Sequence, residues 1–180
     1  MVFPEAVSRN NISFCRCYFF GWRAVDNVNL SLSPLFRCYE DKITQQILRK
    51  IENVTGVPEI NYEFLQILRY EQGGLYKKHS DFIPADISHN QGVRVLTFFI
   101  YLNDGEPGKG GETFFPHMNV KINPKKGKAI LFPNVLSSDP DRQDTRTSHE
   151  ALEVKYGVKH AANVWIHQRD FKTPFYERCS

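Results

Sequence analysis

The sequence lacks the features that mark several classes of protein. None of its 180 residues falls in an apolar run approaching the roughly 18 residues of a membrane-spanning helix, so we expect no membrane span. Its first residues show no charged segment followed by an apolar core, so no signal peptide is visible. The four cysteines form no CxxC pair and follow no zinc-ligand spacing. Lysines and arginines are scattered and the net charge is only +3, which predicts no nucleic-acid-binding surface.

The composition is that of one folded domain. Hydrophobic residues make up 41% and aromatic residues 13% of the chain, which is enough apolar surface for a sizeable core and argues against disorder. Residues 1–37 contain aromatics and cysteines without a sustained period, so they are predicted to form an irregular or divergent N-terminal segment. Residues 38–180 are predicted to form the domain that carries the chemistry.

Apolar residues recur at helical spacing between residues 41 and 54. They are Ile43, Ile47, Ile51 and Val54. This spacing predicts an amphipathic helix, which Gly56 and Pro58 would end. We expect this helix to brace a sheet.

The rest of the chain has the pattern of short strands separated by turns. The predicted strands are residues 64–70, 75–82, 93–102, 112–115, 120–122, 128–132, a strand reaching residue 149, and residues 158–167. Many short strands at such spacing indicate a mainly β sandwich or jelly roll with a flanking helix. The two long segments 83–92 and 134–148 are interpreted as lids, or else as plain surface loops.

His79 and Asp81 stand two residues apart, and His149 follows much later. Residues two apart on an extended strand point to the same side, so His79 and Asp81 can reach one ion together. His149 would then come from a strand folded back beside them. Two imidazoles and one carboxylate on one face suit Fe(II) and leave positions open for a co-substrate and oxygen. The alternative is an HxD pair in a solvated turn and an unrelated surface histidine.

Lys159 is the second residue of the last predicted strand and lies on the same face as Ala161 and Trp165. A lysine on the cavity face of a buried strand is costly unless an anion meets it. An iron site that uses an acidic co-substrate would supply that anion. The alternative is a lysine at the rim, with its stem packed and its ammonium group in water.

Five segments of the sequence carry a family resemblance through their order and spacing. They are residues 68–81, 94–103, 110–116, 124–129 and 149–165. From about residue 41 to residue 171 the chain resembles the 2-oxoglutarate- and Fe(II)-dependent dioxygenases, specifically the prolyl 4-hydroxylase-like branch. A lysine as the anchor of 2-oxoglutarate is typical of the collagen-type and plant- or alga-type enzymes. The resemblance implies a double-stranded β-helix, the jelly-roll core of the cupins.

The resemblance also implies a role for each candidate residue. His79, Asp81 and His149 would bind Fe(II). Three further residues would hold 2-oxoglutarate: Lys159, Tyr70 and Thr113. Three would surround a peptide substrate: Tyr76, Arg94 and Trp165. The remaining histidines are interpreted as structural or surface residues: His89, His117, His160 and His167.

The implied reaction is hydroxylation of a peptidyl proline at C4 with Fe(II), 2-oxoglutarate and O2, releasing succinate and CO2. L-Ascorbate is the expected rescuing cofactor, and a proline-containing peptide or protein is the expected partner. The family suggests the endoplasmic reticulum, with the cytoplasm as the alternative because no signal peptide is visible. The sequence leaves the oligomeric state open.

Three other functions remain compatible with the sequence. The same chemistry could act on another residue or on a small molecule. The chain could be an inactive jelly-roll binding module that keeps the pocket. A zinc cupin could use the same three ligands, but that hypothesis leaves Lys159 without an anion.

Overall fold

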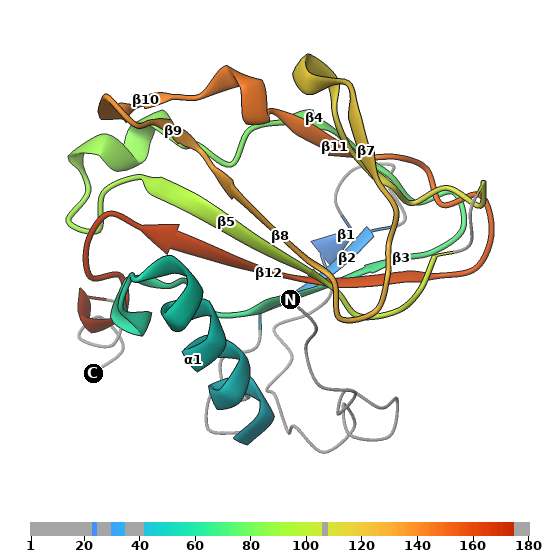
Figure 1. Ribbon diagram of the computed structural model, residues 1–180, viewed down its shortest axis with the longest axis horizontal. Coiled ribbons are helices and arrows are strands. Elements are labelled where there is room, and N and C mark those ends of the chain that lie inside the picture. The colour runs from blue at the N-terminus through green and yellow to red at the C-terminus, as the bar shows by residue number, and fades with distance from the viewer. Residues whose placement is uncertain (1–22, 25–29, 35–41, 106–107, 175–180) are drawn as a thin grey trace.

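The structure, a computed structural model, describes residues 23–24, 30–34, 42–105 and 108–174 and consists mainly of antiparallel β-sheet (Figure 1). One sheet has six strands in the order β1-β2-β3-β12-β5-β8. Their bounds are Arg23–Ala24, Leu30–Pro34, Gln66–Tyr70, Lys159–His167, Arg94–Tyr101 and Ala129–Pro133. A second sheet has the order β4-β11-β6-β7. Its strands are Tyr76–His79, His149–Ala151, Thr113–Phe115 and Val120–Ile122.

The remaining described strands and the 3-10 helices are short. Strands β9 (Val135–Leu136) and β10 (Asp139–Gln143) form a separate two-stranded sheet. Among the described residues, four short 3-10 helices lie in the connections: Glu59–Asn61, Pro84–Ser88, Pro116–Met118 and Thr145–Thr147. No helix among the described residues is long and apolar enough to cross a membrane.

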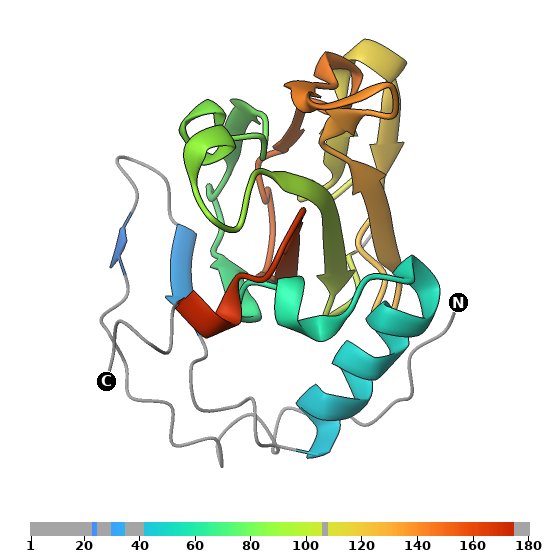
Figure 2. The ribbon, with the colours of Figure 1, turned by 90° about the vertical axis from the view of Figure 1, so that its left-hand side faces the viewer.

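Helix α1 (Lys42–Thr55) covers the outer face of the six-stranded sheet. It confirms the predicted helix to within one residue at each end. It ends at Gly56, whose φ of 68° is a left-handed conformation that glycine adopts without steric cost. Figure 2 shows the helix at the base of the molecule, with the orange segment that contains β9 and β10 at the opposite end.

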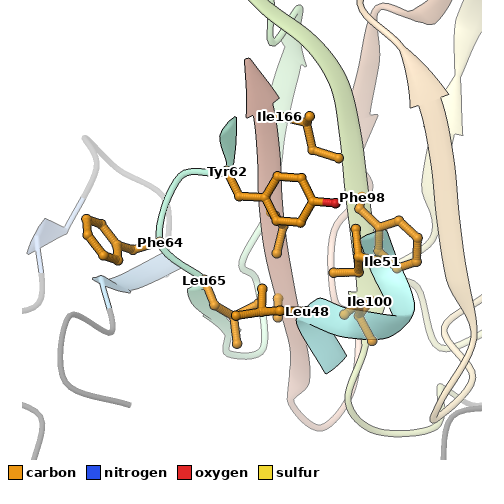
Figure 3. Packing of buried hydrophobic residues seen from close by; sticks show 10 residues of the cluster. Leu48, Ile51, Tyr62, Phe64, Leu65, Phe98, Ile100 and Ile166 are labelled. Carbon is orange, nitrogen blue, oxygen red and sulfur yellow. The ribbon is translucent and has the colours of Figure 1, made fainter. Parts of the chain in front are cut away.

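The outer core lies between α1 and the sheet (Figure 3). Leu48 and Ile51 of α1 point toward Phe98 and Ile100 of β5, and the ring of Tyr62 fills the space beside them. All five side chains are at most 3% exposed. The even-numbered residues of β5 from Leu96 to Ile100 therefore belong to the layer beneath the helix.

On the other face of the sheet, the odd-numbered residues of β5 from Thr97 to Tyr101 face the second sheet. Phe99 and Tyr101 of β5 and Ala161 of β12 pack with Ala151 of β11 in an inner core. Side chains alternate between the two faces of a strand, so both faces of this sheet are buried. This double burial explains why residues 93–102 read as a nearly continuous apolar run.

The register of two strand pairs brings the candidate residues together. β11 runs antiparallel to β4 with His149 opposite His79. β12 runs antiparallel to β3 with Lys159 opposite Tyr70. Paired residues of neighbouring strands lie within about 5.5 Å at their Cα atoms, so residues distant in sequence become immediate neighbours.

The structure corrects three details of the expected fold. Strand β4 ends at His79, so Asp81 lies just beyond the strand rather than inside it. Residues 134–148, expected as a loop, contain β9 and β10. The segment 1–37, expected to be irregular, contains two short strands, and β2 pairs with β3 over a short run, Leu30–Pro34, in which apolar and polar residues alternate. The domain boundary after residue 37 stays a prediction, and all four cysteines lie outside the described residues.

We predict that Leu48→Ala lowers the free energy of unfolding by about 2–5 kcal/mol, because it leaves a cavity between α1 and the sheet. Val54→Ala on the same helix is the matched control, since Val54 is 40% exposed and Leu48 is 0% exposed. Its effect is expected to stay below about 1 kcal/mol. Urea unfolding measures both, and equal losses would show that α1 does not hold the outer core.

Candidate metal centre

Three potential metal ligands converge between β4 and β11. His79 lies at the end of β4, Asp81 two residues later, and His149 at the start of β11. Their ligand atoms all lie within 4.8 Å of one another. Nε2 of His79 is 3.6 Å from Oδ1 of Asp81, and Nε2 of His149 is 3.9 Å from Oδ2 of the same carboxylate. No other group of three such residues forms in the parts of the chain that the structure describes.

Both imidazoles are oriented by a backbone carbonyl. Nδ1 of His79 lies 2.8 Å from the carbonyl oxygen of Lys77, and Nδ1 of His149 lies 3.1 Å from that of Thr147. A carbonyl only accepts, so each Nδ1 carries the proton and each Nε2 keeps its lone pair. The free lone pairs of both rings therefore point at the space beside Asp81. This arrangement of ring and carbonyl is usual for histidines that bind metals.

The environment of His79 favours its neutral form. Burial, and then the charge of the neighbouring His149, hold the pKa of His79 below its ordinary value. The two rings lie 4.4 Å apart between centroids, which explains this mutual effect. A neutral imidazole is the form that binds a metal ion, so the donor set fits a divalent cation. Two histidines and one carboxylate are the ligands of the non-haem Fe(II) facial triad.

A cavity of about 300 Å³ opens beside the three ligands. Eight of its lining residues were predicted from sequence, and they are His79, Asp81, His149, Tyr70, Thr113, Tyr76, Arg94 and Trp165. The fold therefore gathers eight of the nine predicted site residues around one space. The ninth, Lys159, contributes to the wall of a neighbouring cavity of about 260 Å³.

The ammonium group of Lys159 nevertheless lies directly behind the first cavity. Its Nζ is 4.9 Å from the ring centre of Tyr70 and 5.4 Å from that of Phe99, and both rings line the cavity beside the three ligands. The residue is 3% exposed, and its Nζ has no hydrogen-bond partner. Burial lowers the pKa of Lys159 to about 7, against which the charge of Glu112 raises it. A buried, unpaired amine at the end of a cavity fits the anionic end of a ligand.

Thr113 also lies where a ligand would reach it, and it has a protein partner. Its hydroxyl accepts a hydrogen bond of 2.7 Å from the hydroxyl of Tyr101. Tyr101 is fully buried, and its ring centre lies 5.6 Å from Nζ of Lys159. Tyr101 was not predicted as a site residue. Its position as the one polar aromatic in the apolar run of β5 was the available signal.

Arg94 is held by partners that the sequence did not suggest. Its guanidinium forms a two-point ion pair with Glu63 and stacks 3.9 Å above the ring of Trp165. Nε2 of His167 lies 2.9 Å from the same carboxylate. Burial raises the pKa of Glu63, but the contacts with His167 and Arg94 outweigh it and hold the pKa below its ordinary value. His167 is 2% exposed and is thus structural, as interpreted.

Two polar atoms near the cavity lack partners among the described residues. They are Oδ1 of Asn163 and Nε1 of Trp165, which lie on the same face of β12 as Lys159. Asn163 was missed because an asparagine on a strand gives no distinctive pattern. Tyr76, the third predicted peptide contact, packs edge-on against His79 with ring centres 4.1 Å apart. The roles of these side chains in substrate binding stay predictions.

Comparison with known proteins decides the family. The model of the 2OG-Fe(II) oxygenase superfamily matches residues 65–167. The chain belongs to this superfamily. Its segment from β3 to the end of β12 therefore contains the whole candidate site, and the predicted dioxygenase family is confirmed.

The relatives that the comparison found include prolyl hydroxylases. The chain is 33% identical over 152 residues to prolyl 4-hydroxylase subunit alpha-1 of Mus musculus, and 35% identical over 152 residues to subunit alpha-2 of Gallus gallus. These matches cover 81% and 83% of this chain but only 28% of each relative. A viral collagen prolyl hydroxylase of Paramecium Bursaria Chlorella virus-1, solved as a 2OG complex, is 32% identical with a TM-score of 0.64. The matched region spans 77% of this chain and 79% of the viral chain. The predicted jelly-roll fold is confirmed.

We predict that Lys159→Met stabilises the ligand-free protein. Lys159 has a pKa of about 7 in the fold and 10.5 ordinarily, so between these pH values the unfolded state binds more protons. The contribution of this group to the free energy of unfolding therefore rises with pH from about 7 to about 10.5. Below pH 7 the amine is charged in both states, and the cost of burying that charge is present in full, on the order of a few kcal/mol. Methionine removes both the cost of burying the charged amine and the rise of stability with pH that Lys159 causes. Urea unfolding at pH 6 and pH 9 measures this, and an unchanged slope in the variant would contradict it.

Proposed function

We propose that this chain hydroxylates a peptidyl proline at C4, using Fe(II), 2-oxoglutarate and O2. One oxygen atom of O2 would enter the hydroxyl group and the other the carboxylate of succinate, with loss of CO2. The observation that carries the proposal is the buried, unpaired amine of Lys159 behind the cavity of the His79, Asp81 and His149 centre. The similarity to prolyl 4-hydroxylases supports proline as the target.

Different residues of the site would bind Fe(II) and 2-oxoglutarate. His79, Asp81 and His149 would hold Fe(II), which supplies oxygen activation when bound. Lys159 would bind the distal carboxylate of 2-oxoglutarate through a charge-assisted contact, replacing the partner that it lacks in the protein. Tyr70 and Thr113 line the same cavity and would add hydroxyl contacts.

The peptide would lie against the aromatic side chains at the cavity wall. Tyr76 and Trp165 present apolar rings suited to a proline ring. Nε1 of Trp165 is buried and unpaired, so it would donate to a carbonyl oxygen of the peptide. Arg94 already forms an ion pair with Glu63, and its stacking on Trp165 would fix the indole for this contact.

The competing functions differ in what they require of the site. A zinc cupin with the same three ligands leaves the amine of Lys159 without an anion. An inactive binding module would retain the cavity without turnover, and succinate release tests this. The same chemistry on another residue or a small molecule is decided by a panel of substrates.

We also propose that L-ascorbate is a cofactor of this chain and that the endoplasmic reticulum is its location. Both are expectations that the family resemblance of the sequence implies. Asn53 begins an Asn-x-Thr sequon and is exposed on α1, so it is available to a glycan. Imaging of the tagged chain in cells tests the location, and recovery of an oxidised sample by ascorbate tests the cofactor.

A proline-rich or collagen-like peptide is the proposed partner. We predict that anaerobic titration with Fe(II) and 2-oxoglutarate gives the visible charge-transfer band of the chelate. His149→Ala should abolish the band and succinate release, because it removes a ligand. Lys159→Ala should weaken 2-oxoglutarate at least tenfold while Fe(II) affinity changes little, because the amine lies apart from the three ligands. Full succinate yield from His149→Ala, or unchanged 2-oxoglutarate affinity in Lys159→Ala, would refute the respective role.

We predict that Trp165→Phe raises the KM for a proline-containing peptide about tenfold, the equivalent of about one hydrogen bond. Phenylalanine keeps an aromatic face beneath Arg94 but has no N–H to donate. The KM for 2-oxoglutarate is the internal control and should stay the same. Peptide-dependent succinate release gives both values, and an unchanged peptide KM would remove the proposed contact.

A further inference from the structure

Thr97 and Asn134 form a buried polar pair that the site described so far does not use. Thr97 lies in the middle of the apolar strand β5, and Asn134 follows β8. Each is only 1% exposed. Burying a hydroxyl and an amide costs free energy unless hydrogen bonds replace water, so their partners reveal what the pair does.

The pair hydrogen-bonds to a metal ligand. Oγ1 of Thr97 donates to Oδ2 of Asp81 over 2.6 Å, and Nδ2 of Asn134 donates to Oγ1 of Thr97 over 2.9 Å. An amide N–H only donates, so it occupies a lone pair of the hydroxyl and directs the hydroxyl proton to Asp81. Asn134 therefore fixes the direction of the hydrogen bond that Thr97 gives to the carboxylate.

The backbone of Asn134 is itself anchored. Its N–H donates to the carbonyl of Val95 on β5, over 2.8 Å, and its carbonyl accepts from the N–H of Asp144 over 2.9 Å. The amide that directs Thr97 is thus held between the sheet and the far end of the segment 134–148.

The other end of this segment reaches the second histidine. The carbonyl of Asp144 accepts a hydrogen bond of 3.0 Å from the hydroxyl of Thr147. The carbonyl of Thr147 accepts from Nδ1 of His149 over 3.1 Å. The two ends of the segment 134–148 therefore contact the two sides of the metal centre, Asp81 through Thr97 and His149 directly.

We propose that Thr97 and Asn134 are positioning residues for the metal ligand Asp81, and that the segment 134–148 braces the metal centre. The inference rests on the metal centre of the proposed function. The hydrogen bond from Thr97 restricts rotation of the carboxylate and engages one of its two oxygens. The carboxylate would thereby be held in the orientation in which it could bind the ion together with His79 and His149.

This role differs from the lid that the sequence suggested for residues 134–148. A lid needs few contacts with the site so that it can open, whereas this segment is tied at both ends to residues of the metal centre. Hydrogen-bonded neighbours of metal ligands typically change metal affinity by 10- to 100-fold when they are removed. The pair should therefore control how tightly the ion is held.

The test compares metal affinity in the whole chain with Co(II), an air-stable probe, by calorimetry and by its visible absorption. Thr97→Val removes the hydroxyl at nearly constant volume and should weaken Co(II) by 10- to 100-fold and alter its spectrum. Thr97→Ser retains the hydroxyl and should stay within about threefold of the natural protein. Thr55→Val is the matched control, because its hydroxyl bonds to the carbonyl of Ile51 on α1, far from the metal centre.

Asn134→Leu provides a second arm. Asn134 acts through Thr97, so the double variant Thr97→Val/Asn134→Leu should bind Co(II) no more weakly than Thr97→Val alone. Urea unfolding of each metal-free variant separates loss of fold from loss of affinity. Wild-type affinity in Thr97→Val, or equal losses in the serine and valine variants, would overturn the positioning role while the metal centre stands. Failure of the natural protein itself to bind Co(II) would overturn the metal centre and the proposed function with it.

Discussion

The antiparallel pairing of β11 with β4 is the constraint on which the site depends. It places His149 directly opposite His79, although the two residues are far apart in the chain. The chain then continues past the end of β4 to Asp81, whose carboxylate oxygens lie 3.6 Å from Nε2 of His79 and 3.9 Å from Nε2 of His149. A slip of one residue in this register would turn His149 to the other face of the sheet. The bonds from both rings to backbone carbonyls then fix the direction of the ligand atoms.

The cavity beside these ligands is built from one face of the six-stranded sheet. The opposite face of the sheet packs under α1, so the strands are stabilised without using the residues of the site. This separation allows the inner face to carry groups that cost stability. Lys159 is one such group, because its amine is buried without a hydrogen-bond partner. Its cost to the ligand-free protein is what a carboxylate of the co-substrate would recover on binding.

Much of the site was predictable because its chemistry needs rare residue types at defined spacings. Metal binding calls for the HxD pair and the later histidine, and binding of an anion calls for the lysine of the last strand. These residue types stand out from the apolar and neutral residues around them. The residues that orient them were missed. Thr97, Asn134 and Glu63 occur within ordinary strand and loop patterns, and their partners lie 16 to 104 positions away in the chain. No local pattern reports such distant contacts.

The sequence by itself determined the helix α1, most of the strands and the candidate metal ligands, because periodicity and ligand chemistry are local properties of the chain. Only the tertiary structure decided that Asp81 lies beyond its strand, that Arg94 is engaged by Glu63, and that the segment 134–148 is tied to both sides of the metal centre. These outcomes depend on strand register and on which buried polar groups meet. Both are settled by packing of the whole domain, since every buried donor and acceptor must find its partner at once.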